Sequence, residues 1–283
     1  MATKTSTGNE TEKVSETGSK SKAESHFQAG MLKHCVSQWQ QLTSDELVLK
    51  MVQGGKIPIS DFSKLPTTKN TQNQVPGHLW SDTDQEVVKL LTLGVIQRTE
   101  HEEDELISPV FLVQKHDGSH RMILNLKQFN EAVEYQHLKM ENLSAATKMM
   151  RTGCYMASVD LQHAYYSVPI HPNFRKFLKF KWRGQLYAYT CFANGFTNCP
   201  RCFTKLLKPM YALLRAQGFL SASFIDDCYL QGQTISECQE NINATVDLFQ
   251  TLGFTIHDEK SVLEPTKTLM TVTLSPQKAD GLY

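Results

Sequence analysis

The sequence lacks long hydrophobic runs, and each apolar stretch is well short of the ~20 residues that a membrane-spanning helix needs. The first 25 residues contain no apolar segment of the kind found in a secretory signal peptide. Neither sign of charge is in excess, since Lys plus Arg and Asp plus Glu each number 29. This balance disfavours nucleic-acid binding by bulk charge alone. Together these absences predict an intracellular protein, cytoplasmic or nuclear, with no membrane partner.

Cysteine occurs seven times, and without a signal peptide this number predicts free thiols in a reducing compartment. Cys199 and Cys202 have the spacing of a redox C-x-x-C motif, but no thioredoxin-like βαβ pattern surrounds them. Cys191 lies near them in the sequence, but a fourth ligand for a zinc site is not apparent. We expect all three thiols to pack in the core.

Composition divides the chain into four parts. Residues 1–28 hold too few apolar side chains to offset the entropy of ordering, which predicts a disordered tail. Residues 29–80 have the pattern of an N-terminal helical extension followed by a linker rich in proline and glycine. Residues 81–264 carry the strand and helix patterns of a folded domain. Residues 265–283, interrupted by proline and glycine, are predicted to form an irregular tail.

The second half of the chain alternates strands and helices in an informative order. The strand "CYMASVDL" ends near Asp160, and "SFIDDCYL" has the pattern of two strands joined through Asp226 and Asp227. A helix that begins at Pro200 precedes this hairpin, a second helix follows it, and residues 254–256 are predicted as the last strand. Apart from one inserted hairpin, the order is β-α-β-β-α-β. This order predicts an α+β fold with a ferredoxin-like antiparallel sheet and both helices on one face.

Three carboxylates gather at one end of this predicted sheet. The topology makes the first strand a neighbour of the middle hairpin, which brings Asp160 close to Asp226 and Asp227. Two adjacent aspartates alone would also fit an exposed turn. Three carboxylates at one sheet edge are instead typical of an oxygen-ligand site for Mg²⁺, and they are enough to bridge two ions.

A family resemblance runs from roughly residue 39 to 264, and five segments carry it. They are "SPVFLVQKHDGSHRMILNLKQFN", "ASVDLQHAYYSVPIH", "CFANGFTNCPRCFTKLLKPMYALLRAQG", "FIDD" and "LGFTIHDEKSVLEP". In this order they resemble the reverse transcriptase domain of retrotransposons, closest to the DIRS-like group that uses a tyrosine recombinase. The resemblance implies the fingers and palm of a right-hand polymerase, with the palm core at residues 154–170 and 200–264.

The resemblance also implies an activity and its partners. It predicts an RNA-directed DNA polymerase that adds deoxynucleotides, supplied as triphosphates, to a primer 3′-hydroxyl on an RNA or DNA template. Two Mg²⁺ ions would assist, and Mn²⁺ could replace them. In an intact element, RNase H and recombinase modules would follow downstream.

The resemblance assigns the metal site and one proton donor. Asp160, Asp226 and Asp227 would be the catalytic triad that binds the ions, with the Leu161 carbonyl as a further ligand. Lys260 would protonate the leaving pyrophosphate, although an exposed lysine after a strand explains its presence equally well.

The resemblance also assigns the nucleotide contacts. Lys115 and Arg121, on the two strands of one hairpin, would clamp the triphosphate; without the other motifs, a solvated hairpin face would explain them. Tyr165 would exclude the 2′-hydroxyl of a ribonucleotide, or would be a core aromatic, as its neighbour is expected to be. Asn194 and Gly195 would lie beside the nucleotide, because a glycine lets the backbone approach closely.

The stretch "RKFLKFKWR" is locally basic although the chain as a whole is neutral. Lys179, Lys181 and Arg183 alternate with Phe180 and Trp182, so a strand would place cations on one side and rings on the other. The three cations could bind nucleic-acid phosphates. An ordinary amphipathic strand explains the same alternation.

Two departures from the family pattern leave a second hypothesis open. Ala193 replaces the usual proline before the glycine turn, and the C-terminal stretch lacks the Leu-Gly hairpin that would grip the primer. Neither a thumb nor an RNase H pattern follows it. The alternative to an active enzyme is therefore a catalytically impaired or domesticated remnant that only binds nucleic acid. An RNA-templated RNA polymerase is disfavoured by the aromatic side chain of Tyr165.

Overall fold

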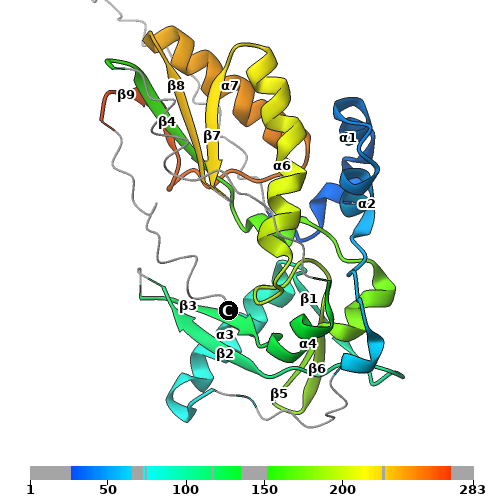
Figure 1. The fold of residues 1–283 in the computed structure, drawn as a ribbon. Helices are drawn as coiled ribbons and strands as arrows, with labels where there is room; N and C mark the ends of the chain where they lie inside the picture. Colours follow the sequence, from blue (N-terminus) through cyan, green and yellow to red (C-terminus); the bar gives the residue numbers. More distant parts are fainter. Residues whose placement is uncertain are drawn as a thin grey trace, which may run out of the picture.

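The structure is a computed structural model that describes residues 27–65, 73, 75–115, 118–134, 152–224 and 227–268. Figure 1 shows two lobes, one built on strands β4, β7, β8 and β9 and the other on strands β1, β2, β3, β5 and β6. We call the first lobe the palm and the second the fingers. In the part of the chain that the structure describes, no helix has the length and apolar character needed to cross a membrane.

The palm sheet has four strands in the order β7-β8-β4-β9, and every neighbouring pair is antiparallel. Helix α6 follows β4 after the inserted hairpin, and helix α7 connects β8 to β9, so the order is the predicted β-α-β-β-α-β. The bounds are β4 Tyr155–Asp160, α6 Cys199–Ala216, β7 Leu220–Phe224, β8 Asp227–Gly232, α7 Ile235–Thr251 and β9 Val262–Thr266. Helices α6 and α7 contact each other and the sheet. The predicted α+β fold class is confirmed.

The last strand of the palm differs from the prediction. It runs from Val262 to Thr266, whereas residues 254–256 pair only through a bridge from Ile256 to Leu161. Phe254 and Ile256 are apolar and Thr255 is polar, which is the sequence alternation of a strand, but all three residues are buried. The chain then turns at His257 before it joins the sheet, so the true strand also extends past residue 264, the predicted end of the palm.

The fingers contain a two-stranded hairpin and a three-stranded antiparallel sheet of order β1-β6-β5. The strands are β1 Ile96–Thr99, β2 Val110–Gln114, β3 His120–Leu124, β5 Lys179–Trp182 and β6 Gln185–Tyr189. Arg183 and Gly184 join β5 to β6 with φ values of 48° and 83°. Positive φ at both central residues is the requirement of a type I′ turn, whose twist matches that of a hairpin.

The remaining helical segments cover the two lobes. They are the short 3₁₀ segments η1 Met31–His34, η2 Phe62–Lys64, η3 Gly77–Leu79, η4 Ala164–Ser167 and η5 Pro172–Phe177, and the helices α1 Val36–Leu42, α2 Glu46–Gly54, α3 Trp80–Thr92 and α4 Lys127–Ala132. Figure 1 shows α1 and α2 beside α6.

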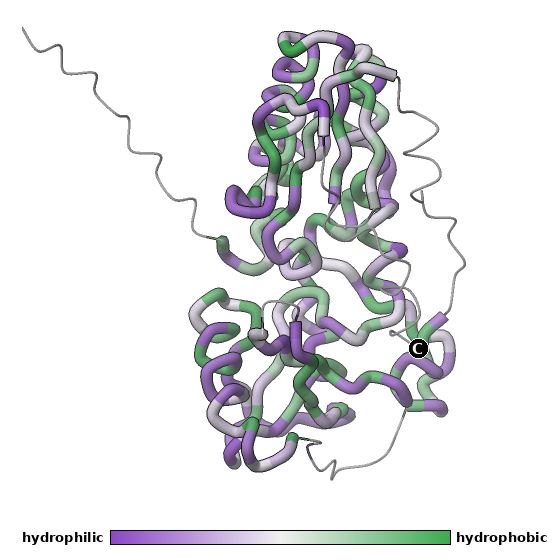
Figure 2. The backbone as a smooth tube through the Cα atoms, turned by 90° about the vertical axis from the view of Figure 1, so that its left-hand side faces the viewer, coloured by the Kyte–Doolittle hydropathy of each residue, from purple (hydrophilic) through white to green (hydrophobic). Residues whose placement is uncertain are grey.

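One hydrophobic core joins the N-terminal segment to both lobes. Trp39 in α1 is fully buried, and its indole Nε1 donates a hydrogen bond of 3.0 Å to the carbonyl of Leu252 in the palm. Phe27, inside the range predicted to be disordered, is also buried. Figure 2 shows hydrophobic segments running through both lobes rather than gathering in one of them. The N-terminal helices are therefore part of the folded unit.

All seven cysteines are free thiols. Cys191 and Cys199 are buried, and burial raises the pKa of each thiol above its ordinary value. Burial also raises the pKa of Cys202. These environments agree with packing rather than with reactive or metal-binding thiolates.

Candidate active site

Asp160 and Asp227 lie directly opposite each other on neighbouring strands. Asp160 is the last residue of β4 and Asp227 the first of β8, and the antiparallel register pairs them. Side chains of directly opposed residues project from the same face of a sheet, about 5 Å apart at Cβ. Both residues are half-buried. Asp226, the third predicted carboxylate, lies outside the described residues.

Two opposed carboxylates form an unfavourable pair unless a positive charge lies near them. Like charges at directly opposite positions destabilise a sheet. Carboxylate oxygens are also the ligands that Mg²⁺ prefers, so Asp160 and Asp227 fit a divalent cation. Among the described residues, no group of three or more His, Cys, Asp or Glu side chains could hold a metal ion. A complete site at this edge would therefore need oxygen ligands beyond this pair.

The backbone of Asp160 is held by residues 257–261, the turn that precedes β9. The Asp160 amide donates to the hydroxyl of Ser261 at 3.0 Å, and the Asp160 carbonyl accepts from the His257 amide at 2.9 Å. The amides of Lys260 and Ser261 both donate to the His257 carbonyl, at 3.1 and 3.0 Å. The Lys260 side chain is exposed. Leu161 continues this junction through its bridge to Ile256, and its own side chain is buried.

The β2–β3 hairpin presents Lys115 and Arg121 on the same face. Arg121 pairs with Val113, and the Lys115 amide donates to the Ser119 carbonyl at 2.7 Å, which continues the register toward the turn. Because side chains alternate along a strand, Lys115 and Arg121 are diagonal neighbours. The Lys115 ammonium donates to the Ser119 hydroxyl at 3.0 Å, and the Arg121 side chain is exposed. The opposite face of the hairpin, represented by Met122, is buried.

The two neighbouring tyrosines after Asp160 have different environments. Tyr166 is buried, and its hydroxyl accepts a hydrogen bond of 2.7 Å from the Asn194 side-chain amide. Tyr165 is half-buried, and its ring meets that of Phe203 edge to face with the centroids 5.6 Å apart. Tyr165 is thus more exposed than the core residue Tyr166.

Gly195 brings the palm against the fingers. Its φ is 105°, and an added Cβ would lie 2.1 Å from the carbonyl oxygen of Leu124 in β3. The Leu124 amide in turn donates to the Asn194 carbonyl at 3.2 Å, and the Asn130 side-chain amide donates to the Gly195 carbonyl at 2.9 Å. The close approach that a glycine allows at this position is therefore to the fingers backbone. Sequence reasoning missed Asn130, which also accepts from the Thr197 amide at 3.1 Å.

His163 lies at the same junction and was also missed from the sequence. Its φ is 53°, in the left-handed region that few side chains adopt. Burial, together with the positive charges of Lys89, Lys115 and Arg121, lowers the pKa of His163 to about 4. The neutral ring stacks on Tyr166 with centroids 5.8 Å apart. His163 therefore lies near enough to Lys115 and Arg121 for their charges to act on it.

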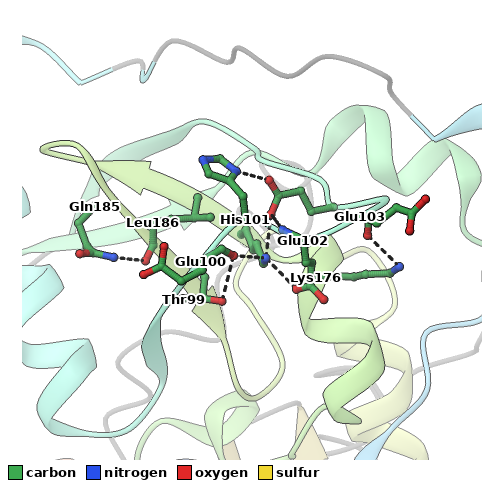
Figure 3. A network of polar contacts seen from close by, with 10 residues as sticks. Thr99, Glu100, His101, Glu102, Glu103, Lys176, Gln185 and Leu186 are labelled. Carbon is green, nitrogen blue, oxygen red and sulfur yellow. Dashed lines mark hydrogen bonds and ion pairs between the residues drawn. The ribbon is translucent and has the colours of Figure 1, made fainter.

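Lys179 does not fit the phosphate contact predicted for it. Its side chain is 1% exposed, and its ammonium contacts Glu102 Oε1 at 2.7 Å and Glu105 Oε2 at 2.8 Å. It also donates a hydrogen bond of 2.9 Å to the carbonyl of Glu100. Figure 3 shows Glu100 and Glu102 within one polar network. Burial pushes the pKa of Glu105 upward, but hydrogen bonds from Lys179 and His101 outweigh it and hold the pKa below its ordinary value. A buried ammonium must be paired. The three contacts of Lys179 match the three N–H donors of its ammonium group.

Arg183 is likewise engaged within the protein, whereas Lys181 is exposed. The Arg183 guanidinium contacts both carboxylate oxygens of Asp84, at 2.8 and 3.2 Å, and lies 4.8 Å from the ring centroid of Trp80. Hydrogen bonds from Arg183 and from Trp182 hold the pKa of Asp84 below its ordinary value. The predicted basic face is therefore reduced to Lys181 and the outer part of Arg183.

The family model for "Reverse transcriptase (RNA-dependent DNA polymerase)" matches residues 113–271. The chain belongs to the reverse transcriptase family. Its similarity to the Pro-Pol polyprotein of Simian foamy virus type 1 is 25% identity over 154 residues, which is 54% of this chain and 13% of the polyprotein. The putative enzymatic polyprotein of Cassava vein mosaic virus is 22% identical over 230 residues, covering 74% of this chain and 34% of that protein. The chain thus spans a minor part of these relatives.

Solved reverse transcriptase structures share the fold. The crystal structure of the Prototype Foamy Virus protease-reverse transcriptase has a TM-score of 0.63 and 20% identity, covering 75% of this chain and 27% of that one. A foamy viral protease-reverse transcriptase in complex with double-stranded DNA has a TM-score of 0.63 and 19% identity, covering 82% and 44%. These likenesses establish the architecture of fingers and palm.

Proposed function

We propose that the chain is the RNA-directed DNA polymerase domain of a retrotransposon, and that it extends a primer with deoxynucleotides. The observation that carries this proposal is the register pair of Asp160 and Asp227 at one edge of the palm sheet. Two opposed carboxylates on a reverse transcriptase fold are costly in isolation and useful around a divalent cation.

Each predicted residue has a role in this proposal. Asp160, Asp226 and Asp227, with the Leu161 carbonyl, would hold two Mg²⁺ or Mn²⁺ ions. When bound, the ions would lower the pKa of the primer 3′-hydroxyl and neutralise charge on the transferred phosphate. Lys260, whose side chain is exposed beside this edge, would give a proton to the leaving pyrophosphate.

The nucleotide would be held between the fingers hairpin and the palm. Lys115 and Arg121 share one hairpin face and would bind its triphosphate as paired cations. The half-buried Tyr165 would place its ring under the sugar and exclude a 2′-hydroxyl. Asn194 and Gly195 would lie beside the nucleotide, in a palm loop that packs against β3.

The partners follow from the same proposal. The foamy viral relatives were solved with double-stranded DNA and with an RNA/DNA hybrid, which supports a primer paired with an RNA or DNA template. The five motifs favour the DIRS-like group, in which RNase H and recombinase modules would lie downstream. Lys181 is the exposed member of the basic stretch that would contact nucleic-acid phosphates.

A second candidate function is nucleic-acid binding without catalysis. The departure at Ala193 favours this alternative, because the family usually has a proline there. Ala193 is fully buried, so the substitution changes the packing before the Gly195 turn rather than an exposed contact.

Primer extension distinguishes the two functions. Purified chain, a labelled primer on an RNA template, deoxynucleoside triphosphates and Mg²⁺ should give extended products. Asp160→Asn and Asp227→Asn should each reduce the rate by at least about 10³-fold, because they remove a charged oxygen ligand from the reacting centre. Asp247→Asn, an exposed carboxylate of α7, is the matched control and should retain the rate. Template binding without extension by the unmodified chain would favour the remnant.

A further inference from the structure

Asp160 points its backbone polar groups away from Asp227. Its amide donates to Ser261 and its carbonyl accepts from His257, and both partners belong to the turn on the β9 side. The pairing of Asp160 with Asp227 on the β8 side is therefore of the non-hydrogen-bonded kind, in which the Cα atoms approach to about 4.5 Å. The two contacts with the turn therefore hold both the amide and the carbonyl of Asp160.

We propose that Ser261 is a positioning residue for Asp160, and that the turn at residues 257–261 keeps Asp160 and Lys260 in a fixed relation. This inference rests on the proposed function, in which Asp160 is a metal ligand. The Ser261 hydroxyl supplies the acceptor that the Asp160 amide uses at 3.0 Å. A side chain thus replaces the backbone carbonyl that an ordinary strand neighbour would offer.

The turn itself is closed by the residues that hold Asp160. The His257 amide donates to the Asp160 carbonyl, while the His257 carbonyl accepts from the amides of Lys260 and Ser261. The two ends of the turn, His257 and Ser261, therefore form hydrogen bonds with the carbonyl and the amide of Asp160. Lys260 lies between these ends, so a displacement of Ser261 moves Asp160 and Lys260 together.

The β4–β9 pairing explains why a side chain is needed. The ladder pairs Ser158 with Val262 and Met156 with Thr266, with a register shift between the two pairs. β9 begins only at Val262, so Asp160 lies beyond the regular part of the ladder. A serine immediately before the strand is short enough to fold back onto the Asp160 amide. Alanine at this position removes the acceptor, whereas threonine retains it.

The test compares Ser261→Ala and Ser261→Thr with a control variant, Thr266→Val. The Thr266 hydroxyl also contacts nearby backbone, but it lies at the other end of β9. Amide hydrogen exchange at Asp160 should become faster in Ser261→Ala and stay slow in the other two variants. Titration with Mn²⁺ should show an affinity about tenfold lower for Ser261→Ala, the loss that residues supporting metal ligands commonly cause. Ser261→Thr should restore the affinity.

Two results would overturn the proposal. Unchanged exchange at Asp160 in Ser261→Ala would show that the hydroxyl does not hold this amide. Unchanged Mn²⁺ affinity, with only a lower urea midpoint, would reduce Ser261 to a stabilising role. If the unmodified chain bound no Mn²⁺, the proposed function would fail, whereas the exchange measurement would still decide whether Ser261 positions Asp160.

Discussion

The fingers sheet and the edge of the palm sheet differ in the charges that they bring together. In the fingers, the Lys179 ammonium is buried between Glu102 and Glu105, so opposite charges meet and stay paired. At the palm edge, Asp160 faces Asp227, so like charges meet. The first arrangement holds the protein together. In the proposed function, the second arrangement would hold divalent cations, and this contrast separates a structural network from a candidate reaction centre.

The largest expected loss of stability comes from removing Lys179 from its ion pairs in the fingers. Lys179→Met removes the buried cation and leaves two glutamates without their partner, which should lower the free energy of unfolding by about 3 kcal/mol. Lys181→Met, two residues along the same strand but exposed, should change it by less than ~0.5 kcal/mol. Urea denaturation of both variants gives the comparison. If both substitutions changed the free energy of unfolding equally, the buried ion pairs of Lys179 would contribute no more to stability than an exposed lysine does.

The next largest loss of stability is expected where the palm loop at Gly195 contacts β3 of the fingers. Gly195→Ala places a Cβ against the Leu124 carbonyl at a φ of 105°, and we expect a loss of about 2–3 kcal/mol. Gly184→Ala is the matched control, because its φ of 83° carries similar backbone strain but no atom lies within 4 Å of the added Cβ. Thermal unfolding of both variants should separate the clash from the strain. Similar midpoints would argue against tight packing of the palm loop on β3.

A smaller effect depends on pH. The pKa of His163 is lowered from 6.5 to about 4 in the folded protein, so the unfolded chain binds the proton more readily. Stability from this group is complete above pH 6.5 and is lost as the pH falls toward 4. Urea midpoints measured between pH 7 and 5 should therefore fall less steeply for His163→Gln than for the unmodified chain. Parallel curves would show that His163 titrates normally.

The smallest effect tests the palm edge directly. Without divalent ions, Asp227→Asn should raise the free energy of unfolding by several tenths of a kcal/mol, because it removes a like-charge contact. Addition of Mn²⁺ should then stabilise the unmodified chain more than the variant. Asp247→Asn should show neither change. A destabilising Asp227→Asn substitution in the absence of metal would contradict the repulsion inferred here.

The strand and helix order was enough to predict the palm. Patterns around Asp160 and Asp227 indicated neighbouring strands, and the pairing of β4 with β8 places these residues opposite each other. The hairpin that carries Lys115 and Arg121 and the inserted hairpin also form as expected, and Gly118 and Gly184 supply a positive φ at their turns. These features are local or follow from a small set of allowed topologies.

Features that depend on distant partners were not predictable in the same way. Lys179 alternates with aromatic residues as an exposed cation would, and its burial is set by Glu105, which lies 74 residues away in the sequence. Residues 254–256 have the alternation of a strand, but the turn at His257 moves the sheet pairing to β9. The roles assigned to Tyr165 and Lys260 remain predictions.

The contact between Trp39 and Leu252 has a consequence for synthesis of the chain. These residues are 213 positions apart, and the Trp39 ring is fully buried once the palm has formed. At a translation rate of about 5–20 residues per second, Trp39 leaves the ribosome roughly 10–40 seconds before Leu252 does. During that interval the apolar face of the first helices has no palm to cover it. Throughout that interval the nascent chain therefore carries a tryptophan that the palm does not yet cover.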